Sequence, residues 1–334
     1  MDARPKSVVF APVAMAPDKD LPIIYGRGEI SGNFMHLTTS IDIFASAFYM
    51  LSRWEVCVSE KRDTHKRLET GEHLSVLHGF SQRPVVNEYA ELLGEMLCHV
   101  GFDRERRASP HELILTHDVD RLYRGPLAES IRKCLRFKDS KRFLIDSFYR
   151  AARIDVFGTF RRIMQHSESH GLKSHFYFIA GGLSAKEGYY ELAQREVVEL
   201  IREIRNRGHV LGFHPSYQTY RNPDQWNRER EVLQDAIGCE VREGRQHYLR
   251  FENPKTWRIW DDAGMEMDST MGFADRVGFT CGTGNSFPVF DVLARRQLDL
   301  REQPLLVMDS ALMKMNAPQE ELTNIIEACN QYYM

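Results

Sequence analysis

The chain has 334 residues, of which 43% are hydrophobic and 27% charged, and its formal net charge is −3. This length accommodates one large α/β domain beside a smaller one, and a near-neutral charge argues against nucleic acid as the main partner. The six cysteines are scattered without a CxxC pair, the N-terminus lacks the apolar run of a signal peptide, and no stretch is apolar for long enough to span a bilayer. We therefore expect a cytoplasmic protein without a transmembrane segment.

The N-terminal residues 1–108 predict a small α/β accessory domain. Short apolar runs indicate strands, and apolar residues at helical spacing indicate amphipathic helices. We expect strands at 8–13 and 21–30, helices at 42–56 and 86–100, and a loop at 65–83. A charged segment ending in Ser109-Pro110 then marks a domain boundary.

Residues 109–334 alternate between expected strands and helices. The strands are expected at 113–120, 174–180, 209–213, 244–251, 265–269, 279–282 and 305–308. The helices are expected within 127–170 and at 189–207, 226–239, 256–264 and 319–333. Such alternation is typical of a parallel sheet, either closed into a barrel or doubly wound.

Ionisable side chains stand at the ends of four predicted strands: Asp118 and Asp120, His214, Arg245 and His247, and Asp268. Chemistry in α/β folds is kept at these strand ends, and buried carboxylates are costly unless they are paired or bind a metal. Carboxylates and imidazoles from different strands suit a catalytic divalent metal ion with an open position for water. A carboxylate left outside the ligand set could deprotonate that water, with an arginine beside it.

Taken in chain order, four motifs resemble the polysaccharide deacetylase (NodB homology) superfamily, which includes carbohydrate esterase family 4. They are Thr116-His-Asp-Val-Asp120, Ser174-His-Phe-Tyr-Phe-Ile179, Gly208-His-Val-Leu-Gly-Phe-His214 and Arg245-Gln-His-Tyr248. The runs HDVD, GHxxGxHPSY and RQHYLR, with the segment 42–55, are similar to a bacterial branch associated with surface-polysaccharide synthesis.

The resemblance implies a distorted (β/α)7-type deacetylase barrel that removes N-acetyl groups from sugars with one divalent metal ion, expected to be zinc or another first-row ion. By position, Asp118 matches the general base and Arg245 the arginine that pairs with it. Asp120 and His214 match metal ligands. The implied substrate is an N-acylated sugar of O-antigen or capsule assembly, carried as a nucleotide sugar or a lipid-linked glycan.

Two departures from the family pattern leave alternatives open. The usual His-x-x-x-His pair is reduced here to His214 and Gln218, so His117 or His247 is expected to supply the missing ligand; we place His117 with the metal and His247 with the catalytic residues. His209 and His175 are expected to be structural. No histidine follows His247, whereas the family has a late strand that carries a histidine acid.

The missing late histidine has three explanations: the sequence stops before that strand, His247 acts as the acid, or full activity has been lost. The first explanation predicts an open sheet edge beside the strand at 113–120. The last makes the chain a catalytically impaired carbohydrate-binding or scaffold protein on the same fold. Hydrolysis of a non-sugar amide is a further alternative.

Overall fold

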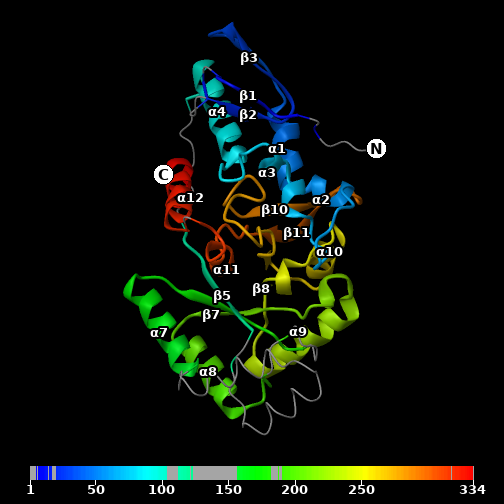
Figure 1. Cartoon of the computed structure of the whole chain (residues 1–334), viewed down its shortest axis with the longest axis vertical. Coiled ribbons are helices and arrows are strands. Elements are labelled where there is room, and N and C mark those ends of the chain that lie inside the picture. The colour runs from blue at the N-terminus through cyan, green and yellow to red at the C-terminus, as the bar shows by residue number, and fades with distance from the viewer. Residues whose placement is uncertain are drawn as a thin grey trace. The chain divides into compact units, whose positions relative to one another are not determined.

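The computed structural model describes residues 5, 7–13, 15–16, 20–103, 112–120, 122, 156–181, 187, 190–316 and 318–333. The chain forms two compact units (Figure 1). Unit 1 comprises Met1–His111 and Tyr248–Met334, and unit 2 comprises Glu112–His247. The sequence analysis divided the chain into 1–108 and 109–334, whereas here residues 248–334 belong to the same unit as the N-terminal residues. None of the described helices is long and apolar enough to cross a membrane.

Unit 2 is built on a parallel sheet in the order β5-β6-β7-β8. Its strands are β5 (Leu115–Val119), β6 (Ser174–Phe178), β7 (Val210–Phe213) and β8 (Glu243–Gly244). Its helices are α7 (Val156–Ser169), α8 (Arg195–Asn206) and α9 (Pro223–Ile237). Among the described residues β5 pairs with β6 alone, so the sheet is open at this strand and closure into a barrel is not seen.

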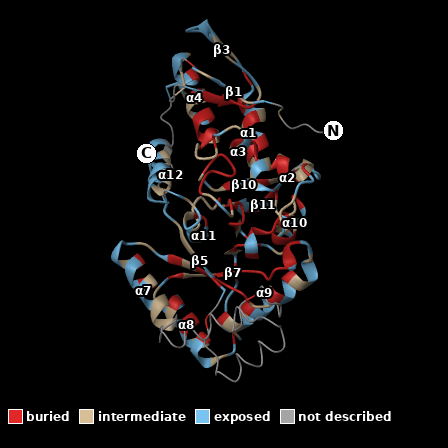
Figure 2. Cartoon of the chain, viewed as in Figure 1, coloured by how far each residue is buried: buried red, intermediate tan, exposed pale blue. Residues whose placement is uncertain are grey.

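The helices of unit 2 form because their apolar residues recur on one face. In α8 the buried residues follow the i, i+3, i+4, i+7 spacing of an amphipathic helix: Val197, Leu200, Ile201 and Ile204. Helix α9 begins at the Asn222 cap, whose side chain accepts from the Gln225 backbone N–H, and ends at Gly238 with φ of 72°. Figure 1 shows α7, α8 and α9 on the same side of β5 and β7, and Figure 2 shows exposed outer faces on α8 and α9.

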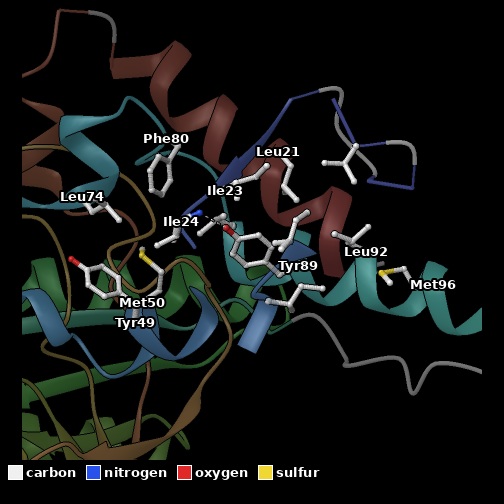
Figure 3. Close-up of a cluster of buried hydrophobic side chains, with 14 residues drawn as sticks. Leu21, Ile23, Ile24, Tyr49, Met50, Leu74, Phe80, Tyr89, Leu92 and Met96 are labelled. Atoms are coloured by element: carbon white, nitrogen blue, oxygen red, sulfur yellow. Dashed lines mark hydrogen bonds between the residues drawn. The ribbon is translucent and has the colours of Figure 1, made fainter. Parts of the chain in front are cut away.

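The N-terminal part of unit 1 packs helices on short antiparallel strands. The strands are β1 (Val9–Ala11), β2 (Leu21–Ile23), β3 (Gly26–Asn33) and β4 (His36–Ile41). The helical segments are α1 (Ile43–Leu51), α2 (Trp54–Val58), η1 (Thr70–Glu72), α3 (Leu74–Leu77) and α4 (Val85–His99). Their core includes Leu21, Tyr89 and Leu92, and the Tyr89 hydroxyl accepts from the Ile24 backbone N–H at 3.2 Å (Figure 3).

The C-terminal part of unit 1 begins after the short 3-10 helix η3 (His247–Leu249). Strand β11 (Arg296–Glu302) pairs antiparallel with β10 (Phe287–Asp291) and parallel with β9 (Met267–Asp268). The helices are α10 (Lys255–Asp262), α11 (Asp309–Leu312) and α12 (Pro318–Tyr333).

Several predicted elements differ from the structure. The expected strand at 279–282 is a turn that ends at Gly282, with φ of 69°, and the expected strand at 305–308 makes only one bridge, from Leu305 to Gly272. Strands β4, β10 and β11 were not predicted. The helix expected at 42–56 divides into α1 and α2 because Arg53 has a φ of 52°, which no helix accommodates. The helical region expected at 127–170 lies outside the described residues until α7 begins.

Candidate active site

The candidate site of unit 2 lies at the carboxyl ends of β5, β7 and β8. Side chains alternate across a strand, so Thr116 and Asp118 share one face of β5, and Asp120 continues their spacing just beyond the strand. His214 follows β7 directly, and Arg245 and His247 follow β8. Parallel strands end at the same edge of a sheet, so residues far apart in sequence meet here.

Three side chains converge as a candidate metal centre: Asp120, His214 and His247. The Nε2 atom of His214 lies 2.9 Å from Nδ1 of His247 and 3.5 Å from Oδ1 of Asp120. The same Asp120 oxygen lies 3.6 Å from Nδ1 of His247. Both histidines are buried, whereas half of the Asp120 side chain is exposed, with a relative exposure of 50%. The two imidazoles are therefore shielded from solvent, and the carboxylate lies on the solvent-exposed side of the group.

The donor set fits a first-row divalent ion. Two ligand atoms about 2.0–2.1 Å from a tetrahedral zinc lie about 3.3 Å apart, close to the separations observed here. The Arg245 carbonyl lies 2.6 Å from Nδ1 of His214, which must therefore carry the proton, and this leaves the lone pair of Nε2 for a cation.

The electrostatic field at His214 also favours positive charge. Burial lowers the pKa of His214, but the nearby Asp118 and Asp120 carboxylates, helped by the Arg245 carbonyl, outweigh burial, and the net result is a raised pKa. The carboxylates that favour a proton on Nε2 of His214 also favour a metal ion bound to the same nitrogen.

Asp118 lies beside this group and is held by Arg245. Nη1 of Arg245 donates to Oδ1 of Asp118 at 2.9 Å, and Nη2 of Arg245 donates to the Thr116 hydroxyl at 2.8 Å. The other carboxylate oxygen of Asp118 lies 3.9 Å from Nε2 of His214. The Asp118 side chain is 26% exposed, so a substrate or a water can reach it. Asp118 therefore lies next to the candidate metal centre without belonging to it.

A partly buried polar network packs against Arg245. Its guanidinium lies over the Tyr177 ring, 5.4 Å from the ring centre. The Tyr177 hydroxyl donates to Glu243 at 3.0 Å, and Nδ1 of His175 lies 2.5 Å from the same oxygen. Tyr177 and Glu243 were not among the site residues predicted from the sequence. Glu243 stands two residues before Arg245, so the alternation of an extended chain could have placed both on one face.

The structure does not bring His117 to the metal centre, although the sequence analysis placed it there. His117 alternates with Thr116 and Asp118, so it faces the other side of β5. Its Nε2 lies 3.2 Å from the Ser174 hydroxyl, and its ring stacks on Phe176. His247 is the third member of the candidate metal centre instead, and Gln218 is exposed.

The remaining predicted residues have other surroundings. His209 is buried; its Nδ1 accepts from the Ser174 backbone N–H, and its Nε2 lies 3.1 Å from Glu168. Asp268 is buried at the end of β9, in unit 1, where the Thr270 hydroxyl donates to it.

Comparisons with known proteins give partial likenesses. A model of a family of unknown function (DUF7033) matches residues 5–101, and no curated protein matches the chain. A Mycobacterium smegmatis protein assigned as a polysaccharide deacetylase has 16% identity and a TM-score of 0.37, over 64% of this chain and 72% of its own. A Bacillus cereus polysaccharide deacetylase has 13% identity and a TM-score of 0.28, over 65% and 86%. A pseudoenzyme of the CE4 family from Bacillus anthracis has 14% identity and a TM-score of 0.29, over 52% and 57%. Scores this low leave the function to be argued from the site.

Proposed function

We propose that unit 2 is a metal-dependent amide hydrolase that removes the acyl group from an N-acylated sugar. One observation carries the proposal: Asp120, His214 and His247 converge, with the Asp118 carboxylate beside them and bound by Arg245. Two imidazoles and one carboxylate form the ligand type of hydrolytic zinc sites, and a separate carboxylate supplies the base.

Each residue of the site has a distinct role in the proposed reaction. Asp120, His214 and His247 would hold a divalent ion, which supplies Lewis acidity toward the amide carbonyl and lowers the pKa of a water. Asp118 accepts a proton from the attacking water, while Arg245 fixes the direction of its carboxylate. The same carboxyl group can then return that proton to the leaving nitrogen. This route does not need the acid role first assigned to His247, whose Nδ1 faces the other ligands.

The sugar and its pathway are proposed from the motif resemblance. The HDVD, GHxxGxHPSY and RQHYLR runs support an N-acetylated sugar of bacterial surface-polysaccharide synthesis, either O-antigen or capsule. The geometry of the site supports amide hydrolysis in general and leaves the choice of amide to experiment.

The test measures metal content and acetate release in the same preparation. We expect one first-row divalent ion per chain, hydrolysis of N-acetylated sugars, and loss of activity on chelation. Asp118→Asn should keep the metal and lose about 10²–10⁴-fold in turnover, because it removes proton acceptance without removing a ligand. Asp120→Asn is the matched control and should lose metal as well as activity.

Each contrary outcome has a definite meaning. Near-normal turnover in Asp118→Asn would exclude Asp118 as the base. Bound metal without hydrolysis of any sugar or non-sugar amide would favour the impaired, sugar-binding alternative. A wild-type chain that binds no divalent ion would overturn the proposal.

A further inference from the structure

The face of the unit 2 sheet that carries Asp118 also carries polar side chains to which the proposed reaction gives no role. The register of β5 with β6 places Tyr177 beside Asp118, and His175 two residues earlier on the same face. Tyr177 is 1% exposed, and the side chains of His175 and Glu243 are 17% and 19% exposed. These three side chains therefore form a largely shielded layer next to the proposed base.

Glycine at position 212 lets side chains of β6 and β8 meet across β7. Gly212 pairs with Tyr177, and a Cβ atom there would lie 2.3 Å from the Tyr177 ring and 2.9 Å from the Glu243 carbonyl oxygen. Without that atom, the Tyr177 hydroxyl reaches Oε1 of Glu243 and donates to it at 3.0 Å. Nδ1 of His175 lies 2.5 Å from the same oxygen, and because a carboxylate only accepts, this nitrogen carries the proton. One oxygen of Glu243 thus holds both residues.

The Tyr177 ring is the surface on which Arg245 packs. The guanidinium carbon lies over the ring, 5.4 Å from its centre. Burial, and then the Glu243 carboxylate, raise the pKa of Tyr177 well above its usual value, so the phenol keeps its proton and stays a donor to Glu243. A phenol that donates to a carboxylate gains electron density in its ring, which strengthens the attraction of the ring face for a cation. Glu243 therefore acts on Arg245 through Tyr177.

The same guanidinium holds the proposed base. Its two terminal nitrogens donate to Asp118 and to the Thr116 hydroxyl. A planar group held by two hydrogen bonds can pivot about the line that joins the bonded nitrogens, and an aromatic ring packed on its face removes that freedom. The direction in which Arg245 presents its donor to Asp118 thus depends on the position of the ring.

We propose that Glu243 is a positioning residue of the site, which fixes the Tyr177 ring and through it the Arg245 guanidinium that holds Asp118. His175 supports Glu243 by donating to the same carboxylate oxygen. The expected effect on turnover rests on the function proposed above, whereas the effect on Arg245 is measurable without any reaction.

The first test follows the Arg245 side chain by NMR in the full-length protein, with its signals assigned by their loss in Arg245→Lys. Tyr177→Phe keeps the ring and removes the hydroxyl, and Glu243→Gln removes the charge at nearly constant shape. Each should speed rotation of the guanidinium about its Cζ–Nε bond about tenfold, the rate equivalent of one hydrogen bond.

Tyr89→Phe is the matched control for this measurement. Tyr89 is also buried, and its hydroxyl accepts from the Ile24 N–H in unit 1, so the variant loses a comparable contact and should leave the Arg245 signals unchanged. Unchanged rotation in both Tyr177→Phe and Glu243→Gln would overturn the proposal, whether or not the chain hydrolyses an amide.

The second test measures turnover on an N-acetylated sugar that the wild type hydrolyses. In Tyr177→Phe and Glu243→Gln, kcat should fall about tenfold with metal content unchanged and KM within about twofold, because a misdirected base slows the chemical step and leaves substrate binding intact. His175→Asn keeps a donor near the position of Nδ1 and should retain most of the turnover that His175→Leu loses.

The two tests separate this proposal from the proposed function. Faster Arg245 rotation with unchanged kcat would overturn the positioning role, and so would loss of metal from the variants. An inactive wild type would count against the proposed function alone, and the rotation rates of Arg245 would still decide whether Glu243 positions it.

Discussion

The two histidines that compete for the third ligand position differ in the face of the sheet that they occupy. His247 lies within 2.9 Å of His214, whereas His117 faces Ser174 on the other side of β5. His247→Ala should therefore weaken metal binding by about 100-fold or more, because loss of a direct ligand should cost at least as much as loss of an outer-shell partner. His117→Ala should leave metal affinity nearly unchanged. Competition with a chromogenic chelator measures both, and the opposite ranking would return the ligand role to His117.

Ionisation of Glu55 should make the free energy of unfolding of unit 1 depend on pH. Burial raises the pKa of Glu55, but Arg53, His73 and the Leu74 N–H outweigh burial and lower the pKa from 4.5 to about 2. A carboxyl group with a lowered folded-state pKa stabilises the fold above its unfolded pKa and loses this contribution as the pH falls through the folded value. The contribution above pH 4.5 is on the order of 3 kcal/mol and should disappear between pH 4.5 and 2.

Urea unfolding of the wild type and of Glu55→Gln across this pH range measures the effect. The wild type should be more stable by about 3 kcal/mol at pH 7, because the variant leaves Arg53 buried without its partner, and the difference should shrink as the pH falls. Glu60→Gln, at an exposed glutamate, is the control and should show little difference at any pH. A difference between wild type and Glu55→Gln that is constant with pH would contradict the lowered pKa of Glu55.

Strands β6, β7 and β8 approach closely because glycine stands at two crowded positions. A Cβ atom on Gly212 would lie 2.3 Å from the Tyr177 ring, and one on Gly244 would lie 1.9 Å from the Phe213 carbonyl oxygen. Tyr177 packs under Arg245, which holds Asp118, so the spacing of these strands also positions the proposed base.

Gly212→Ala should destabilise the protein by about 1–3 kcal/mol, because the added methyl group must displace the Tyr177 ring. Gly94→Ala is the matched control: Gly94 lies within α4 with open space around its Cα, so alanine there should stabilise by about 0.5–1 kcal/mol. Urea midpoints at constant m-value measure both changes. Equal effects of the two substitutions would show that strand spacing does not depend on Gly212.

At the scale of the whole molecule, unit 1 is assembled from the two ends of the chain. Backbone N–H groups of Val86 and Phe279 donate to the carbonyls of Gly282 and Ser81, and the Asn253 amide donates to the Ser52 carbonyl. Arg53 of the N-terminal part donates to the Thr280 carbonyl of the C-terminal part. The segment 5–101, matched by the family of unknown function, is thus only part of one compact unit.

A fragment of residues 1–111 should be much less stable than the same residues in the full chain. It keeps the core of Figure 3, but Arg53 and several backbone groups lose their partners. Amide hydrogen exchange at Arg53 to Val58 measures this, and adding residues 248–334 in trans should restore protection. Full protection in the fragment alone would show that 1–111 is an independent domain.

The sequence determined the features that depend on local periodicity. The twofold alternation of a strand places Thr116 and Asp118 on one face, and the apolar spacing of 195–206 requires a helix with one buried side. Strand-end position also singled out His214, Arg245 and His247 without any knowledge of their neighbours.

The tertiary structure decided which of these groups meet. His247 joins His214 because β8 lies beside β7 in a register that pairs Gly244 with Phe213, and no local pattern encodes that register. Short apolar runs such as 279–282 fit a strand or a turn equally well. Here Phe279 and Cys281 are buried in a turn. Its Phe279 N–H donates to the Ser81 carbonyl, and its Gly282 carbonyl accepts from the Val86 N–H. Residues 248–334 lie in one unit with the N-terminal residues, and contacts distant in sequence join them. The buried Arg53 side chain, for example, needs a hydrogen-bond acceptor and finds it in the Thr280 carbonyl.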